Sequence, residues 1–457
     1  MRTAPPDLPG SHNTDSPLDR ALTLMLAGER EAALRWSAAV VAVDASVPSA
    51  LILTCRLLAD AGRTEAAIEG FSLGLKRAID SGNLPLAVAA VGDLRLLGVD
   101  VATHLEDIAA AFSEGSPRLT DAIAPPPPPL PNLSEFETLS SFLTGPALLS
   151  KATEIVHAAS DAYAAAAQRD PPLIAPIPLF SSLDKEALRA MLECFEMFTV
   201  PAGKVVVSEG DEGAEAYIVA RGELEVRREI REGDLVETVT LARLTNGALF
   251  GEMALLSRAP RAASVVACRP SILLVARREA LEAVAEHAPD VGVELAAHCR
   301  RRMVANLVKT SPILHAVAIE ERPPLVERFE TKVFEKGEKL IAENEESTGM
   351  HLIASGEVAV VGHEENDEPF VISTLGVGEV VGEVALIFRR KSNADVVAVT
   401  PTVTLHLPRE EFIDLIRAHP GMLSGLYLLA VERDEETRNV LTTSTTSMGE
   451  ADDYVLV

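Results

Sequence analysis

The sequence predicts a multidomain protein of the α plus β class, with an N-terminal helical repeat domain followed by two copies of a strand-rich domain. Three observations carry this prediction. Similar octapeptides recur 34 residues apart near the N-terminus, a proline run follows them, and glycine-punctuated runs of Val, Ile and Leu occur twice after residue 198. With 457 residues, the chain has room for about three domains of ordinary size.

The octapeptides are AGEREAAL at 27–34 and AGRTEAAI at 61–68. The period resembles the tetratricopeptide repeat, in which two antiparallel helices turn at a glycine and pack through small residues. The residues that fit this pattern are Gly28, Gly62, Ala33, Ala67 and, as the bulky residue that follows, Phe71. We therefore expect a helical repeat domain at 17–115 that binds a partner protein. The usual aromatic residues and a third glycine at position 96 are missing, so a generic helical bundle is the alternative.

The proline run APPPPPLP at 124–131 excludes a helix or an inner strand, because proline fixes φ and lacks the backbone donor. We expect a semi-rigid linker over 116–145, with a docking ligand for another protein as the alternative. The alanine-rich segment that follows predicts a connecting helix within 146–177, where further prolines end it.

From residue 198 the pattern changes to strands and turns, and it is duplicated. Glycines repeat at a spacing of 134, as Gly203 and Gly222 do at Gly337 and Gly356, and a Gly-Glu pair repeats at 131. These spacings predict one domain at 178–309 and a second at 310–441, followed by a flexible tail at 442–457.

The segment FGEMALLSRAPRAASV at 250–265 has the chemistry of a phosphate site. Gly251 permits a positive φ or a close backbone approach, and a short helix from Met253 to Leu256 presents free backbone donors. Arg261 offers a permanently charged fork for phosphate oxygens, and the two alanines after it let backbone amides approach. A carboxylate beside a phosphate is repulsive unless a sugar separates them. Glu252 is therefore assigned to a ribose 2′-hydroxyl.

This segment resembles the phosphate-binding cassette of cyclic nucleotide-binding domains, above all those of the regulatory subunits of cAMP-dependent protein kinase, and more loosely the sensor half of the catabolite activator protein. The resemblance implies two β jelly-roll domains of eight strands with flanking helices, and a cyclic nucleotide held between the barrel and the cassette helix. The binding residues that it implies are Gly251, Glu252, Met253, Ala254, Arg261, Ala262 and Ala263. In this family a hydroxyl residue after the arginine accompanies preference for cGMP, so Ala262 favours cAMP. The alternative is an empty barrel in which Arg261 and Glu252 pair with each other.

The second copy, VGEVALIFRRKSNADV at 381–396, is degenerate, because Ser392 stands where the arginine is expected. A weak second site would use Gly382, Glu383, Ala385 and Ser392. Either this site is degraded or altered, or the upstream cations Arg389, Arg390 and Lys391 reach a phosphate from a displaced position, with Asp395 opposing them. The string RRKS also resembles a kinase site, but a solvated charged loop is the simpler interpretation.

The formal net charge of −27 argues against nucleic acid as a partner, and Arg300, Arg301 and Arg302 are interpreted as a solvated helix face. The four cysteines lie far apart and form neither a metal motif nor a disulfide framework, which favours a reducing cytoplasm. Neither a signal peptide nor a membrane span is expected. No nucleophile-base set or nucleotide-hydrolysing loop indicates an enzyme.

Together these observations predict a cytoplasmic cAMP sensor with a regulatory or adaptor role. Its partners would be the cyclic nucleotide and an unidentified protein effector bound by the repeat domain, and a homo-oligomer is left open. The alternatives are a scaffold with ligand-free jelly rolls and an inhibitor of a kinase, although no basic pseudosubstrate precedes Pro178.

Overall fold

A computed structural model describes residues 16–121, 136–166, 171–232, 235–256, 260–310, 328–363 and 369–449. The proline run at 124–131 lies outside these ranges. By contacts between Cα atoms the chain forms two compact units. The first comprises Met1–Val206, Tyr217–Phe250 and Val265–Glu294, and the second comprises Val207–Ala216, Gly251–Ser264 and Leu295–Val457. Among the described helices, none is long and apolar enough to cross a membrane.

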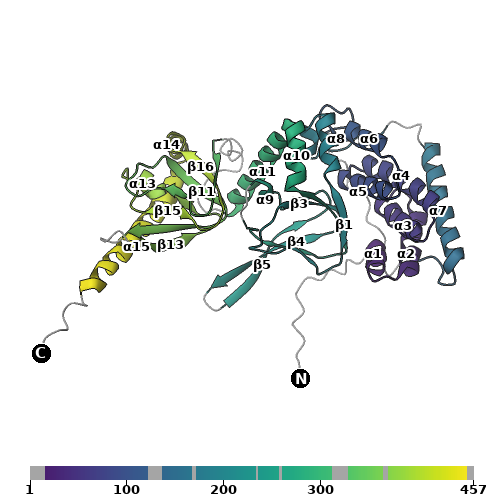
Figure 1. The fold of residues 1–457 in the computed structure, drawn as a ribbon, viewed down its shortest axis with the longest axis horizontal. Coiled ribbons are helices and arrows are strands. Elements are labelled where there is room, and N and C mark those ends of the chain that lie inside the picture. Colours follow the sequence, from purple (N-terminus) through teal and green to yellow (C-terminus); the bar gives the residue numbers. More distant parts are fainter. Residues whose placement is uncertain are drawn as a thin grey trace, which may run out of the picture. The chain divides into compact units, whose positions relative to one another are not determined.

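Seven helices make up most of the described N-terminal region, and consecutive helices from α1 to α6 pack side by side (Figure 1). Its helices are α1 (Pro17–Leu26), α2 (Arg30–Val43), α3 (Pro48–Asp60), α4 (Thr64–Asp80), α5 (Leu84–Leu96), α6 (Ala102–Phe112) and α7 (Gly145–Ala166). Ser16 caps α1 by accepting a hydrogen bond from the Asp19 backbone N–H, and proline starts α1 and α3, where its missing donor costs nothing.

The glycines expected at helix turns are in place. Gly28 and Gly62 have φ of 81° and 78° and end α1 and α3 in the left-handed conformation that glycine adopts without strain. Gly98, with φ of 79°, ends α5 in the same way. A third helix pair therefore exists, but its glycine lies two positions beyond residue 96, where a strict 34-residue period places it.

Helix α7 begins at Gly145, one residue before the region 146–177 that was expected to hold a connecting helix, and it packs against α2, α3 and α4. Leu148, Ala152 and Val156 are fully buried on its inner face. A substituent at Gly70 would lie 2.8 Å from the Val156 side chain, so the close approach of α4 and α7 depends on glycine at that position. The helix is thus a packed layer of the helical region.

Two β-sandwiches with flanking helices follow, as expected from the duplicated pattern (Figure 1). The first is built from η2 (Phe180–Ser182), α8 (Lys185–Glu193), β1 (Glu196–Val200), β2 (Val205–Val207), β3 (Glu215–Arg221), β4 (Leu224–Glu232), β5 (Leu235–Leu244), β6 (Leu249–Phe250), α9 (Met253–Leu256), β7 (Ser264–Ala267), β8 (Ser271–Arg277), α10 (Arg278–His287) and α11 (Pro289–Thr310). Its sheets have the strand orders β1-β8-β3-β6 and β2-β7-β4-β5.

The second sandwich repeats this plan. It consists of β9 (Glu330–Phe334), β10 (Lys339–Ile341), β11 (Gly349–Ser355), β12 (Val358–His363), β13 (Pro369–Leu375), β14 (Val380–Val381), α13 (Glu383–Ile387), β15 (Asp395–Ala398), β16 (Thr402–Pro408), α14 (Arg409–Ala418) and α15 (Pro420–Gly449). The strand orders β14-β11-β16-β9 and β10-β15-β12-β13 correspond to those of the first sandwich. Val403, Leu405 and Leu407 alternate along β16 and are fully buried in the core.

The C-terminal helix α15 differs from expectation, because it continues to Gly449, inside the segment 442–457 that was expected to be a flexible tail. Its earlier turns contact α13, α14 and β13, and an anchored helix extends at little further cost even through residues of modest helix propensity. Leu426 and Ala430 are fully buried where α15 is anchored.

Candidate nucleotide-binding site

The first cassette is the link between β6 and β7. Gly251 follows β6 with φ of 76°, as its sequence context predicted, and the short helix α9 starts two residues later. Ala262 is exposed and Ala263 is half-buried. The side chain of Ala254 lies outside the described part of the structure, whereas that of Met253 is half-buried and packs against the apolar cluster around Met303.

Arg261 lies inside this cassette with only 8% of its surface exposed. Its Nη1 donates to the Gly251 carbonyl and its Nη2 to the Glu215 carbonyl, each at 2.9 Å. Backbone hydrogen bonds fix the residue itself, since Arg261 N–H donates to the Asp211 carbonyl at 2.9 Å and the Arg261 carbonyl accepts from Gly210 N–H at 2.8 Å. A cation is therefore held at the centre of the predicted phosphate site.

Gly213 makes room for this guanidinium. A Cβ atom at residue 213 would lie 2.2 Å from Arg261 Nε and 2.3 Å from its Cζ, so any side chain there would displace the arginine. The role of Gly213 was not evident from its local sequence, because it depends on a contact with a residue 48 positions away. The 134-residue repeat, which aligns Gly213 with Ser347, was the signal that would have found it.

Glu252 is 4% exposed, and its Oε1 lies 3.2 Å from Nε of Arg302 on α11. Burial raises the pKa of Glu252, while the positive charges of Arg302 and Arg261 oppose that shift. The ion pair that the structure shows for Glu252 is with Arg302, and the charge of Arg261 also acts on this carboxylate.

The run Arg300–Arg302 was expected to be a solvated helix face, and this is wrong for two of its three residues. Arg302 pairs with Glu252, and Arg300 donates to the Phe329 carbonyl, whereas Arg301 is exposed. The error arose because a helix in an acidic chain offers its cations to buried carboxylates that are distant in sequence.

The second cassette has the same backbone. Gly382 has φ of 87° and caps α13. Ser392 N–H donates to the Glu345 carbonyl at 2.9 Å and its carbonyl accepts from Asn344 N–H at 2.8 Å, which are the two bonds that Arg261 makes in the first cassette. Ser392 therefore takes the place of the arginine in space as well as in the alignment. Its hydroxyl is buried, with no hydrogen-bond partner among the described residues.

The glycine that accommodates Arg261 is also replaced in the second cassette. Ser347 corresponds to Gly213, is 7% exposed, and donates from its hydroxyl to the Gly349 carbonyl at 2.8 Å. Both members of the Gly213–Arg261 contact have thus changed to serine. The second cassette has lost the cation and also part of the room that a guanidinium needs.

The carboxylate of the cassette and its partner are retained. Glu383 Oε1 accepts a hydrogen bond from Arg433 Nη1 at 2.8 Å, and Arg433 follows Arg302 by the 131 positions that separate the two cassettes. Burial raises the pKa of Glu383, which is 1% exposed, and Arg433 opposes the shift. Its Oε2 is buried without a described partner.

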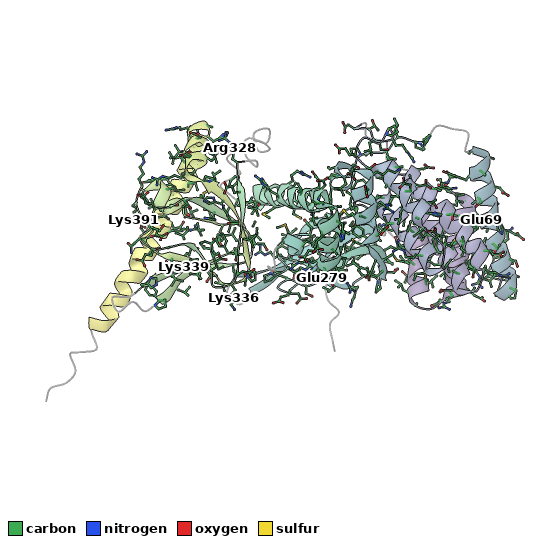
Figure 2. The ribbon with its side chains drawn as sticks, turned by 45° about the horizontal axis from the view of Figure 1, so that its top comes forward. Glu69, Glu279, Arg328, Lys336, Lys339 and Lys391 are labelled. Carbon is green, nitrogen blue, oxygen red and sulfur yellow. The ribbon has the colours of Figure 1, made fainter. Side chains whose placement is uncertain are left out.

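The three cations proposed as substitutes for the missing arginine lie elsewhere. Arg390 pairs with Asp434 and lies over the ring of Phe388, while Arg389 and Lys391 are exposed. Figure 2 shows Lys391 at the outside of the second sandwich. None of the three lines the cavity that the described residues enclose in this domain, whereas Glu383, Ala385 and Ser392 do.

Comparison with known proteins agrees with this geometry. The family model of the cyclic nucleotide-binding domain matches residues 197–288 and 331–419. The chain carries two cyclic nucleotide-binding domains in tandem. It is 32% identical over 238 residues to the cAMP-dependent protein kinase regulatory subunit of Yarrowia lipolytica, which covers 52% of this chain and 58% of that protein.

A similar match is to the cAMP-dependent protein kinase type II regulatory subunit of Drosophila melanogaster, 29% identical over 50% of this chain and 56% of that one. The chain thus spans little more than half the length of these relatives. Among solved structures, the regulatory domain of Toxoplasma gondii PKA with cAMP is 26% identical over 56% of this chain and 92% of that one, with a TM-score of 0.28. The tandem domains therefore resemble those of kinase regulatory subunits, and the tetratricopeptide resemblance of the helical region stays a prediction.

Proposed function

We propose that the chain is a cAMP-sensing regulatory or adaptor protein without catalytic activity, in which the first cyclic nucleotide-binding domain holds the ligand. The observation that carries this proposal is the buried guanidinium of Arg261, which donates to the carbonyls of Gly251 and Glu215 in a space kept open by Gly213. A buried cation at this position is complementary to a cyclic phosphate, because a guanidinium is permanently charged and its fork of N–H donors matches the geometry of phosphate oxygens. The relatives' names support the choice of cAMP.

Each cassette residue has a proposed role. Arg261 binds the exocyclic oxygens of the cyclic phosphate, the backbone amides of Ala262 and Ala263 approach it, and Glu252 accepts a hydrogen bond from the ribose 2′-hydroxyl. Gly251, Met253 and Ala254 shape the cassette around the sugar. Ala262 offers no hydroxyl to a guanine, which favours cAMP over cGMP.

We propose that the signal leaves the site through Glu252 and Arg302. A ribose hydroxyl that donates to Glu252 competes with Arg302 for the same carboxylate. Because Arg302 is on α11, ligand affinity then depends on the position of this helix. The helical region is joined to the strands of the first domain by the buried Asp19–Arg221 pair at 2.6 Å. Partner binding by the helical region is the proposed output.

Calorimetric titration of the full chain tests this function. We expect one tight equivalent of cAMP per chain, weaker binding of cGMP, and clearly weaker binding of 2′-deoxy-cAMP, which lacks the hydroxyl that Glu252 accepts. A scaffold with ligand-free domains gives neither heat nor a thermal shift. Equal affinity for the three nucleotides would refute the proposed cassette contacts.

A further inference from the structure

The second sandwich is hollowed on the outer face of the sheet that contains β12 and β15. Successive side chains of a strand point to opposite faces, and Val360 and Val396 belong to the core between the two sheets. Their neighbours Val361 and Val397 therefore lie on the outer face. A hollow of about 500 Å³ is found there, which is the size of a small-molecule site.

The floor of this hollow is aliphatic, whereas the first domain has charged residues at the same place. Ala359 is 6% exposed, and Val361 and Val397 are half-buried. The counterpart of Ala359 in the first domain, 134 positions earlier, is Glu225. The counterpart of Val361 is Arg227, and these two charged side chains form an ion pair at 2.9 Å. The second domain thus presents an apolar surface that a ligand with an apolar body would remove from water.

The rim of the hollow carries an unpaired positive charge. Lys339 pairs with Asp395 at 2.6 Å, and this carboxylate, which is 3% exposed, also accepts from Glu343 N–H at 2.8 Å. His363 lies with Nδ1 at 2.8 Å from the Glu343 side chain. Lys336 is exposed and has no partner among the described residues. Figure 2 shows both lysines on the same side of the second sandwich.

The dimensions of the hollow favour a small ligand over a protein. Stable protein interfaces take roughly 20–30 residues from each partner, whereas eleven residues line this hollow. An apolar floor with a few polar groups at its edge is typical of sites for small molecules, in which the polar groups fix the orientation of the ligand. A single unpaired lysine at the edge selects a ligand with one negative charge.

We propose that this hollow binds an aliphatic carboxylate, a free fatty acid of medium chain length, with the hydrocarbon chain on Val361 and Val397 and the carboxylate at Lys336. Each methylene that leaves water should tighten binding about threefold to fourfold, whereas an exposed ion pair adds about fivefold at most. The cavity beside the second cassette lies on the inner face of the same sheet, where it is lined by Val360 and Val396. The carboxylate therefore does not compete with a nucleotide in either cassette.

Titration calorimetry of the full chain with hexanoate, octanoate and decanoate, at concentrations where they form no micelles, tests this proposal. We expect saturable binding of decanoate with one equivalent per chain, and about a tenfold gain in affinity for each pair of added methylenes. Decylammonium, which has the same chain and the opposite charge, should bind several-fold more weakly. Saturating cAMP should leave the affinity for decanoate unchanged.

Matched substitutions assign the site. Val361→Arg places the side chain of the first domain in the floor and should abolish binding, whereas Val371→Arg, on an exposed valine of β13 outside the hollow, should not change it. Lys336→Glu should reverse the preference, so that decylammonium binds more tightly than decanoate. Lys391→Glu, which removes an exposed cation elsewhere in the domain, should leave the preference as it is. Urea unfolding of each variant shows that the second domain remains folded.

The inference is overturned if decanoate does not bind the unmodified chain at about 1 mM, an affinity limit that calorimetry reaches. It is also overturned if Val361→Arg binds decanoate as tightly as the unmodified chain, which would indicate surfactant-like association with other surfaces. Equal binding of decanoate and decylammonium by the unmodified chain would overturn the role of Lys336 and with it the ligand class. Because cAMP binding is measured separately, failure of the cAMP proposal gives a different result from failure of this one.

Discussion

At the scale of single residues, the two cassettes differ mainly in one buried cation. Arg261 and Ser392 make the same two backbone hydrogen bonds, so the main chain of the cassette is independent of the side chain that it carries. Glu252 and Glu383 are likewise both buried, and each pairs with an arginine of a later helix, Arg302 of α11 and Arg433 of α15. We therefore expect the affinity for an anion to depend on the side chain at this position and on the glycine that makes room for it, on a common backbone.

This predicts unequal effects of matched substitutions. Arg261→Ala should lower cAMP affinity by about 30-fold to several thousandfold, because truncating one partner of a buried charge contact costs about 2 to 5 kcal/mol. Ser392→Ala should leave cAMP binding unchanged. Titration calorimetry of both variants measures this, and two tight equivalents of cAMP in the unmodified chain would contradict it.

At the scale of elements, the loops before β3 and β7 of the first domain both differ from the corresponding loops of the second domain. Gly213 lies against Arg261 in the first domain, and its counterpart Ser347 lies close to Gly382 of the second cassette, where a Cβ atom at Gly382 would be 3.6 Å from the Ser347 hydroxyl. A cation in this cassette thus requires a glycine in another loop.

We expect Gly213→Ala to lower cAMP affinity almost as much as Arg261→Ala does, because a Cβ 2.2 Å from Nε forces the guanidinium out of its place. The matched control is Gly203→Ala, since Gly203 has φ of 81° but open space around a Cβ, so that its cost falls on stability alone. Affinity and the urea midpoint are measured for both variants. Tight cAMP binding by Gly213→Ala would refute the packing argument.

The same pairing predicts the outcome of restoring the second site. Ser392→Arg alone should not create cAMP binding, because Ser347 occupies part of the space that a guanidinium needs. The double variant Ser347→Gly/Ser392→Arg should add a second cAMP equivalent, detected by calorimetry. A gain of cAMP binding by the single variant would show that the loop adjusts without the glycine.

At the scale of the whole molecule, the helical region and the strands of the first domain share one compact unit. Asp19 of α1 is 2% exposed and pairs with Arg221 at the end of β3 and, at 3.6 Å, with Arg269. Asn83 donates from its side chain to the Ala220 carbonyl at 3.2 Å. These contacts join segments that are 137 to 250 positions apart in sequence, so the helical region and the strands of this unit stabilise each other.

Asp19→Ala should destabilise the chain by about 3–5 kcal/mol, because it leaves the largely buried Arg221 without its counter-charge. Asp60→Ala is the control, since Asp60 pairs with Arg30 in an exposed position where removal of a salt bridge costs about 0–1 kcal/mol. Urea unfolding compares the two variants. Equal midpoints would mean that α1 does not stabilise the folded first domain.

The second domain should be sensitive to mild acid through His351. Burial, followed by the charges of His406 and Lys332, lowers the pKa of His351 to about 3. Between pH 6.5 and about 3 the unfolded chain binds a proton that the folded chain does not, so stability falls as pH falls, by about 1.4 kcal/mol per unit. His351→Gln should remove this contribution to the loss of stability at low pH. Urea unfolding of the unmodified chain and of the variant at pH 7 and pH 5 measures this difference. If both proteins lose the same free energy of unfolding, His351 is not the cause of the acid sensitivity.

The sequence alone determined the order of modules, the duplication and the first cassette. Glycines at spacings of 134 and 131, the 34-residue period and the Gly251-Glu252 pair are local signals, because turns and close backbone approaches admit few residue types wherever they occur. Even the substitution at Ser392 was visible, since it is a difference between two aligned segments of one chain.

Which side chains contact one another depends on the folded chain and could not be predicted from the sequence. The contact of Gly213 with Arg261, the pairing of Glu252 with Arg302 and of Glu383 with Arg433, and the packing of α7 on α2 and α4 all join segments far apart in sequence. Arg302 looked like part of a solvated basic run, because a linear pattern does not reveal which distant carboxylate has been buried beside it. Burial and partner choice are properties of the folded chain, and the chemistry of both cassettes depends on them.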